Sequence, residues 1–294
     1  MTKLNLYRKV GRVLLSGFFC VLLALSALAN RALWGDVYPY ASADRVVGPE
    51  TLERSQGVTT DGSAWFFSGK QSLTKIAFDN KTVLAQNRNA IPDAFRSQYG
   101  STHIGGISFA DGCVWAAIED SKVWRHPIVA VFDGETLEYT GRYVLLHGKD
   151  GGSDTALTRG VPWVTCDPDS GCFYVAQCRH TTQLYAYDLD TFDYVRTIPL
   201  QGEIDRIQGG EVYAGVFYAA TNDATRAVYK IDLACGKIDK LFDRILYQPK
   251  RIDNFGGEGE DMTVLPMADG TLLHTLTIGA LFVDANLCHY QLPD

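Results

Sequence analysis

Polar side chains recur beside a glycine at one position of a repeated sequence pattern. The positions are Gln56, His103, Arg159, Arg206 with Gln208, and Glu258 with Glu260 and Asp261. An imidazole titrates near neutral pH, and a guanidinium group binds carboxylates and phosphates. Crowded carboxyl groups raise the pKa of at least one member, which suits acid–base chemistry or a hard cation such as calcium. The set predicts a polar site for a small anionic ligand.

Individual members of this set suit different roles. The candidate ligand-binding residues are Gln56, His103, Arg159, Arg206, Gln208, Glu258 and Asp261. The candidate catalytic residues are His103, Glu258 and Glu260, and the candidate calcium ligands are Glu258, Glu260 and Asp261. Each role has a structural alternative: a hydrogen-bonded histidine, a solvated acidic turn, and arginines that neutralise that turn. The sequence leaves these alternatives open.

The segment 206–241 shows what must position these side chains. Runs of Val, Ile, Tyr and Phe separated by turn residues suit a pleated, half-buried surface. They predict four antiparallel strands, at Arg206–Val212, Val216–Thr221, Ala227–Asp232 and Lys237–Leu241. One twisted four-stranded sheet cannot bury both of its faces, so similar sheets must stack against it.

The rest of the chain repeats this unit. The turn between the first two strands carries a glycine in every repeat, at Gly62, Gly112, Gly171, Gly215 and Gly270. A third strand then ends in aspartate, at Asp79, Asp133, Asp188, Asp232 and Asp284. Radial repetition of this kind predicts an all-β fold, a five-bladed β-propeller, with Ala43–Val47 as the outer strand that closes the ring. The alternative, a six-bladed ring, needs about forty further residues. A helix is expected only within 90–99.

The first residues have the features of an export signal. Four basic residues precede the apolar run Val13–Leu28, and Ala27-Leu28-Ala29 fits a signal peptidase site. We expect a signal peptide at 1–29, a linker at 30–42 and the propeller domain at 43–294, in a secreted or periplasmic protein. The alternative is a membrane anchor at residues 13–29, because the run approaches the length of a spanning helix.

Charge narrows the choice of partner. Loss of the four basic residues of the signal segment changes the formal net charge from −7 to −11. Such a body repels phosphate backbones and anionic lipid headgroups, which argues against nucleic acid. A membrane is expected as a partner only if the signal segment is uncleaved. A small anionic molecule or a protein partner is the expectation.

Six cysteines follow the predicted signal segment, an even number that is typical of disulfides in exported proteins. Cys166 and Cys172 flank a turn and are candidates for one bridge. Cys235 and Cys288 occupy comparable outer positions of neighbouring repeats and are candidates for another. No C-x-x-C pair points to zinc.

Short motifs add a family resemblance. Gln56-Gly57-Val58, Ile104-Gly105-Gly106-Ile107, and 204–208 with 211–216 resemble the glutamine cyclotransferase type of five-bladed propeller. Gly105, Asp205 and Gln208 stand where that family carries glutamates. Lactonase-like propellers are a more distant match. The resemblance implies the architecture, and two functions stay open: ligand or protein binding at the central channel, or a channel-mouth enzyme of the cyclotransferase or lactonase/hydrolase kind.

Overall fold

The computed structural model describes residues 40–121, 123–147, 157–244, 257–279 and 284–291. The predicted signal segment and residues 30–39 of the predicted linker lie outside this range. In the described residues, no helix has both the length and the apolar character that a membrane crossing requires.

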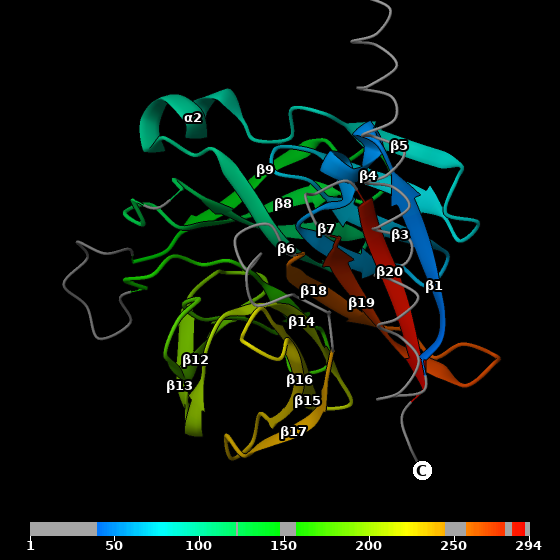
Figure 1. The fold of residues 1–294 in the computed structure, drawn as a ribbon. Helices are drawn as coiled ribbons and strands as arrows, with labels where there is room; N and C mark the ends of the chain where they lie inside the picture. The colour runs from blue at the N-terminus through cyan, green and yellow to red at the C-terminus, as the bar shows by residue number, and fades with distance from the viewer. Residues whose placement is uncertain (1–39, 122, 148–156, 245–256, 280–283, 292–294) are drawn as a thin grey trace, which may run out of the picture.

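The described chain forms five four-stranded antiparallel sheets arranged as the blades of a propeller (Figure 1). The first blade contains β2 (Gly57–Thr60), β3 (Ala64–Ser68), β4 (Leu73–Ala77) and β5 (Val83–Asn87). The second contains β6 (His103–Ala110), β7 (Cys113–Glu119), β8 (Ile128–Asp133) and β9 (Tyr139–Leu145). The third contains β10 (Thr165–Asp167), β11 (Cys172–Val175), β12 (Thr181–Asp188) and β13 (Tyr194–Ile204). The fourth contains β14 (Ile207–Tyr213), β15 (Val216–Thr221), β16 (Ala227–Asp232) and β17 (Ile238–Asp243). The fifth contains β18 (Gly259–Val264), β19 (Thr271–Ile278), β20 (Asp284–Gln291) and β1 (Tyr40–Val47). The five-bladed prediction is confirmed.

Turn chemistry explains why the strands end where they do. All five aligned turn glycines have positive φ, from +67° at Gly171 to +85° at Gly270. A side chain at such a position is strained, so glycine is the suitable residue. Two short helical segments accompany the blades, η1 (Pro49–Arg54) and α2 (Asp93–Tyr99). The second lies inside the predicted helical stretch and ends at Gly100, which caps it in the left-handed conformation.

Strand β1 closes the ring, as predicted, but begins at Tyr40 rather than at Ala43. It pairs antiparallel with β20, and Figure 1 shows the two strands side by side. Asp44 of β1 accepts hydrogen bonds from His289 Nε2 (3.1 Å) and from Asn80 Nδ2 of the first blade (2.5 Å). His289 Nδ1 in turn lies 2.6 Å from Nδ1 of the buried His274. The closing strand is therefore held by side chains of two blades as well as by its ladder.

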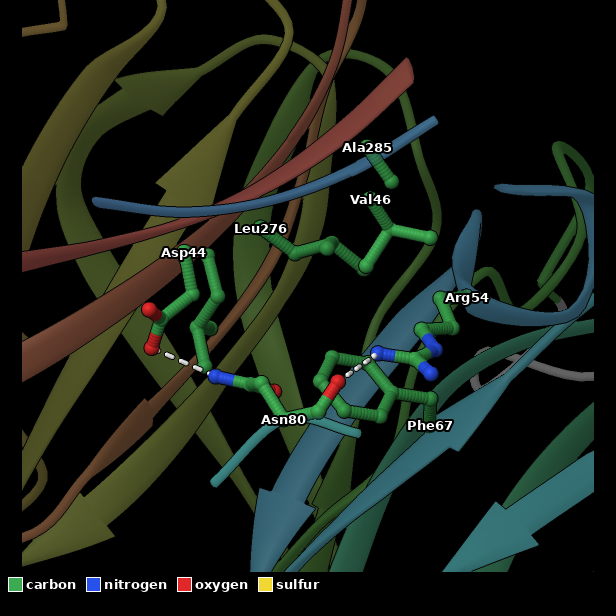
Figure 2. Close-up of a pocket in the computed structure, with 8 residues that line it drawn as sticks. Asp44, Val46, Arg54, Phe67, Asn80, Leu276 and Ala285 are labelled. Carbon is green, nitrogen blue, oxygen red and sulfur yellow. Dashed lines mark hydrogen bonds between the residues drawn. The ribbon is translucent and has the colours of Figure 1, made fainter. Parts of the chain in front are cut away.

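Figure 2 shows a small cavity at this junction of the first and fifth blades. Arg54 Nη1 donates to the Asn80 carbonyl oxygen (3.1 Å), while Val46, Leu276 and Ala285 form the apolar side. Its volume is about 10 Å³, room for no more than one water molecule. The junction is a packed seam and not a ligand pocket.

The fifth repeat differs from its prediction. Its third strand is β20, so Asp284 begins this strand instead of ending it. Residues 281–283 of the predicted strand lie outside the described range. Asp284 is fully buried and pairs with Arg45 Nε of β1 at 2.5 Å. The repeat pattern predicts a strand end at Asp284, whereas this residue is the ion-pair partner of the closing strand.

The disulfide prediction is wrong for the described residues. All six of their cysteines are free thiols, at Cys113, Cys166, Cys172, Cys178, Cys235 and Cys288. In the β10–β11 register Cys166 lies opposite Phe173, and Cys172 lies opposite Asp167. Positions one step apart point to opposite faces of a sheet. Cys166 accordingly packs between blades two and three, and Cys172 packs against the core between blades three and four.

The second proposed pair also fails on position. Cys288 is buried in β20 of the fifth blade, whereas Cys235 is exposed in a turn of the fourth. Cys235 lies three residues after Asp232, as Thr136 does after Asp133, and hydrogen-bonds that aspartate as the threonine does. The Cys235 thiol takes the place of a turn threonine, and this role explains the position of Cys235 in the repeat without a disulfide.

Candidate functional site

The innermost strands β2, β6, β10, β14 and β18 contact one another in that order around the central axis. They begin at one end of the propeller, which we call the upper face. Glycines permit this crowding: a Cβ at Gly105 would lie 2.1 Å from the Pro162 carbonyl oxygen, and one at Gly209 would lie 1.8 Å from Asp261 Oδ1. The predicted polar residues thus lie at or near one end of the axis, but they do not form one cluster.

Gln56 and His103 are joined directly. His103 Nε2 lies 2.5 Å from Gln56 Oε1, and Gln56 Nε2 donates to the Ser55 carbonyl oxygen at 2.6 Å. Because the amide nitrogen of Gln56 already serves as a donor, the His103 Nε2 proton points to Gln56 Oε1 and leaves Nδ1 as an acceptor. Burial, reinforced by the nearby Lys70 ammonium group, lowers the pKa of His103 to about 4. The imidazole is therefore neutral at pH 7.

Glu119 is the third member of this group, and the sequence did not single it out. It ends β7 directly opposite His103 in the β6–β7 register. Burial raises the pKa of Glu119 to about 7, and the Asp120 carboxylate adds to this while the Val161 N–H opposes it. Its Oε2 lies 3.9 Å from His103 Nδ1, which is longer than a hydrogen bond. The pair is not an ion pair, because the imidazole is neutral at the pH where Glu119 ionises.

The loop before β10 covers Glu119. Glu119 Oε1 is buried and accepts no hydrogen bond from any described residue. A Cβ at Gly160 would lie 2.0 Å from this oxygen and 2.7 Å from the Trp124 ring, and Gly160 has φ +76°. Only glycine fits here. A buried carboxyl group with a pKa near 7 beside a neutral imidazole can take up or release a proton at neutral pH.

The two arginines predicted to bind an anion differ in how many contacts their side chains make. Arg206 Nη1 donates to the Asn222 carbonyl oxygen (3.4 Å), and its Nε lies 3.9 Å from the Asp205 carboxylate. Arg159 is exposed, and no hydrogen bond or ion pair joins its side chain to another described residue. Gln208, in β14, accepts from the Cys178 thiol at 3.7 Å. Burial raises the pKa of Cys178 to about 12, so this thiol is protonated at neutral pH.

Asp261 lies at the axis and not at the channel mouth. It is fully buried, and its Oδ2 accepts the backbone N–H groups of Val58 (3.2 Å) and Ile107 (3.1 Å). Its Oδ1 accepts the N–H of Met262 at 2.8 Å. Burial raises the pKa of Asp261 well above its ordinary value, although these three donations lower it. Asp261 therefore joins the first, second and fifth blades by hydrogen bonds, which is a structural role and not a ligand-binding one.

Glu258 and Glu260 form a separate carboxyl pair. Glu260 is buried, and burial, together with the charge and the hydrogen bond of Glu258, raises its pKa well above its ordinary value. Arg244 is also buried nearby, and its Nη1 donates to the Glu260 and Leu276 carbonyl oxygens. Among the described residues no three His, Cys, Asp or Glu side chains are grouped to hold a metal ion. The predicted calcium ion therefore has no candidate site among the described residues.

The two ends of the propeller differ in charge. The turns at the lower end carry a series of exposed or half-exposed aspartates, at Asp79, Asp111, Asp133, Asp169, Asp188, Asp190, Asp193 and Asp232. The upper face carries basic side chains among its acidic ones, at Lys70, Arg125, Arg159, Arg179 and Arg206. The upper face is therefore the less acidic end and repels a small anion less than the lower end does.

Comparison with protein families finds a match to a family defined by a repeat. Residues 106–258 match a repeat of unknown function (DUF6923). This span runs from β6 to the residue before β18 and includes more than half of the 294 residues. The chain belongs to this family. The matched family is not that of the glutamine cyclotransferases.

Other comparisons contribute less. A search of curated proteins found no match to the chain. Among solved structures, Kuenenia stuttgartiensis hydrazine synthase is similar, with 14% sequence identity and a TM-score of 0.43. The similarity covers 79% of this chain but only 58% of that one. It carries no argument about activity.

Proposed function

We propose that this propeller is an exported protein that binds a small organic anion at the upper face, beside Gln56, His103 and Glu119. The observation that supports this best is the Gln56–His103 hydrogen bond, which holds a neutral imidazole next to a buried carboxyl group on the less acidic face. The Gln56–His103 pair fixes one wall of the site, and the basic side chains around it offer charge and hydrogen-bond donors to an anion. The exposed basic side chains of this face are the candidates for the countercharge.

A second candidate function is acid–base catalysis on the bound molecule. It is favoured by the pKa of Glu119, which lies at about 7, where a general acid or base works best. Glutaminyl cyclisation is one reaction that needs such a group, and the resemblance described above supports it as one form of this alternative. Glu119 would then supply the carboxyl group that is missing at Gly105.

Binding can be tested with glutarate, a small dicarboxylate, by isothermal titration calorimetry at pH 7 and low ionic strength. We expect His103→Phe to weaken glutarate binding about tenfold, since the His103–Gln56 hydrogen bond that fixes this wall of the site is lost. His180→Phe is the matched control, because His180 is an exposed histidine of the same face that pairs with Glu203. The uncharged analogue 1,5-pentanediol should not bind. Equal loss in both histidine variants, or equal binding of the diol, would contradict the proposal.

A further inference from the structure

An open cleft of about 270 Å³ lies on the upper face of the first blade. Its walls come from η1, from the turn between β3 and β4, and from the residue after β5. The lining residues are Leu52, Glu53, Lys70, Gln71, Ser72 and Arg88. The cleft adjoins the candidate site, because the Lys70 ammonium group acts on the pKa of His103 and the Lys70 carbonyl oxygen accepts the Ile104 N–H (2.8 Å).

The walls of the cleft are fixed by packing and hydrogen bonds. A Cβ at Gly69 would lie 2.2 Å from the Leu52 carbonyl oxygen, so η1 packs directly on the turn. Gly69 N–H donates to the Ser72 carbonyl oxygen at 3.0 Å. Gln71 accepts from Arg96 Nη1 (3.1 Å) and donates to the Thr102 carbonyl oxygen (3.4 Å). A ligand would therefore meet a preformed surface, which lowers the entropic cost of binding.

The lining of the cleft carries more positive than negative charge. Lys70 is exposed, and its side chain makes no hydrogen bond or ion pair with another described residue. Arg88 uses its Nε for Glu53 (3.2 Å) and for Gln86 (3.0 Å), and its two Nη groups bind no described residue. Glu53 is the one carboxylate in the lining, so the two cations exceed it by one charge. Leu52, which is 65% exposed, provides an apolar patch beside them.

We propose that this cleft holds the charged group of the ligand, with Lys70 and Arg88 as the anion-binding residues. The inference rests on the proposed function and deepens it. The ligand class is a small organic carboxylate with a short aliphatic part: the carboxylate lies between Lys70 and Arg88, the aliphatic part contacts Leu52, and the polar end points to His103. Arg159 and Arg206 then have no direct part in binding.

Titration of glutarate into charge-removing variants tests this assignment. Lys70→Gln and Arg88→Gln should each weaken binding about tenfold, as loss of a charged hydrogen bond predicts. Glu53→Gln should tighten binding about threefold, because it removes the one carboxylate of the cleft. Arg159→Gln, Arg206→Gln and the lower-face control Lys81→Gln should stay within about threefold of the wild type. Lys70, Arg88 and Lys81 are exposed, so folding is expected to be unaffected.

The outcomes separate the two proposals. If Arg159→Gln or Arg206→Gln abolishes binding while Lys70→Gln and Arg88→Gln behave as Lys81→Gln does, the cleft assignment is wrong and the upper-face site stands. If neither glutarate nor inorganic phosphate binds the wild type, both proposals fail. If phosphate binds as tightly as glutarate and responds to the same variants, the cleft recognises charge alone and the organic-carboxylate class is wrong.

Discussion

Replacing Asp261 with alanine should destabilise the propeller by about 3–5 kcal/mol, the order expected when three buried donors lose their acceptor at about 1–3 kcal/mol each. The physical reason is that the buried N–H groups of Val58, Ile107 and Met262 lose their shared acceptor. Two of these donors belong to other blades, so the change weakens the contact of three inner strands at the axis. Urea unfolding at pH 7 measures the free energy of unfolding.

Two further variants define what Asp261 does. Asp261→Asn keeps one acceptor oxygen but turns an amide donor toward an N–H donor, so an intermediate loss is expected. Asp239→Ala is the matched control, because Asp239 is a half-exposed strand residue with a surface ion pair to Lys237 (3.0 Å). Its loss should stay below about 1 kcal/mol. If Asp261→Ala is as stable as Asp239→Ala, Asp261 is not a structural residue. The prediction that it binds a ligand or a metal ion would then be the better explanation.

Glu119→Gln should remove a pH dependence from the stability of the protein. The folded-state pKa of Glu119 is about 7 and its ordinary value is 4.5, so the folded protein holds this proton more tightly. The resulting stability is fully present below pH 4.5 and is lost as the pH rises through 7. Relative to the glutamine variant, the wild type should therefore lose about 3 kcal/mol between pH 4.5 and pH 8. Urea unfolding of both proteins at half-unit pH steps gives the difference.

A second titrating group does not obscure this result. The pKa of His103 is lowered to about 4, so its contribution to stability falls as the pH drops from 6.5 to 4. That contribution is present in both proteins and cancels in the difference. Glu138→Gln, at an exposed position of the second blade, should differ from the wild type by less than about 0.5 kcal/mol throughout. A flat difference for Glu119→Gln as well would show that Glu119 is an ordinary solvated carboxylate.

The fold could be predicted from local patterns because each blade repeats its own turn chemistry. In the fourth blade the predicted strands Val216–Thr221 and Ala227–Asp232 agree with β15 and β16 at both ends. The turn before β15 and the turn after β16 each carry a glycine at positive φ, Gly215 (+75°) and Gly236 (+71°), so little tertiary information is needed there. The fifth blade differs from its prediction at Asp284, where a partly buried ion pair to Arg45 joins β20 to β1. A pairing between residues so distant in sequence leaves no local signal.

The site was predicted only in part, for a related reason. The residues at the start of the inner strands were found, since the repeats align them, and this gave Gln56 and His103. Glu119 was missed because it ends a second strand, where three of the other four blades carry Ser68, Thr221 and Thr277 opposite the inner strand. A carboxylate in place of a small hydroxyl side chain was the available signal. Asp261 was misplaced because sequence does not show which side chains point inward along the axis.

The proposed binding site is tested most directly by the imidazole nitrogen signals of the histidines. In ¹⁵N NMR spectra at pH 7, glutarate should shift the His103 signals in a saturable manner, because His103 lies in the candidate site. His274 and His289 are internal controls, since they are buried at the junction of β1 with the fifth blade and should not respond. Saturable shifts at His103 alone are the predicted result. An unchanged His103 at saturating glutarate, or equal shifts at all three histidines, would contradict binding at the upper face.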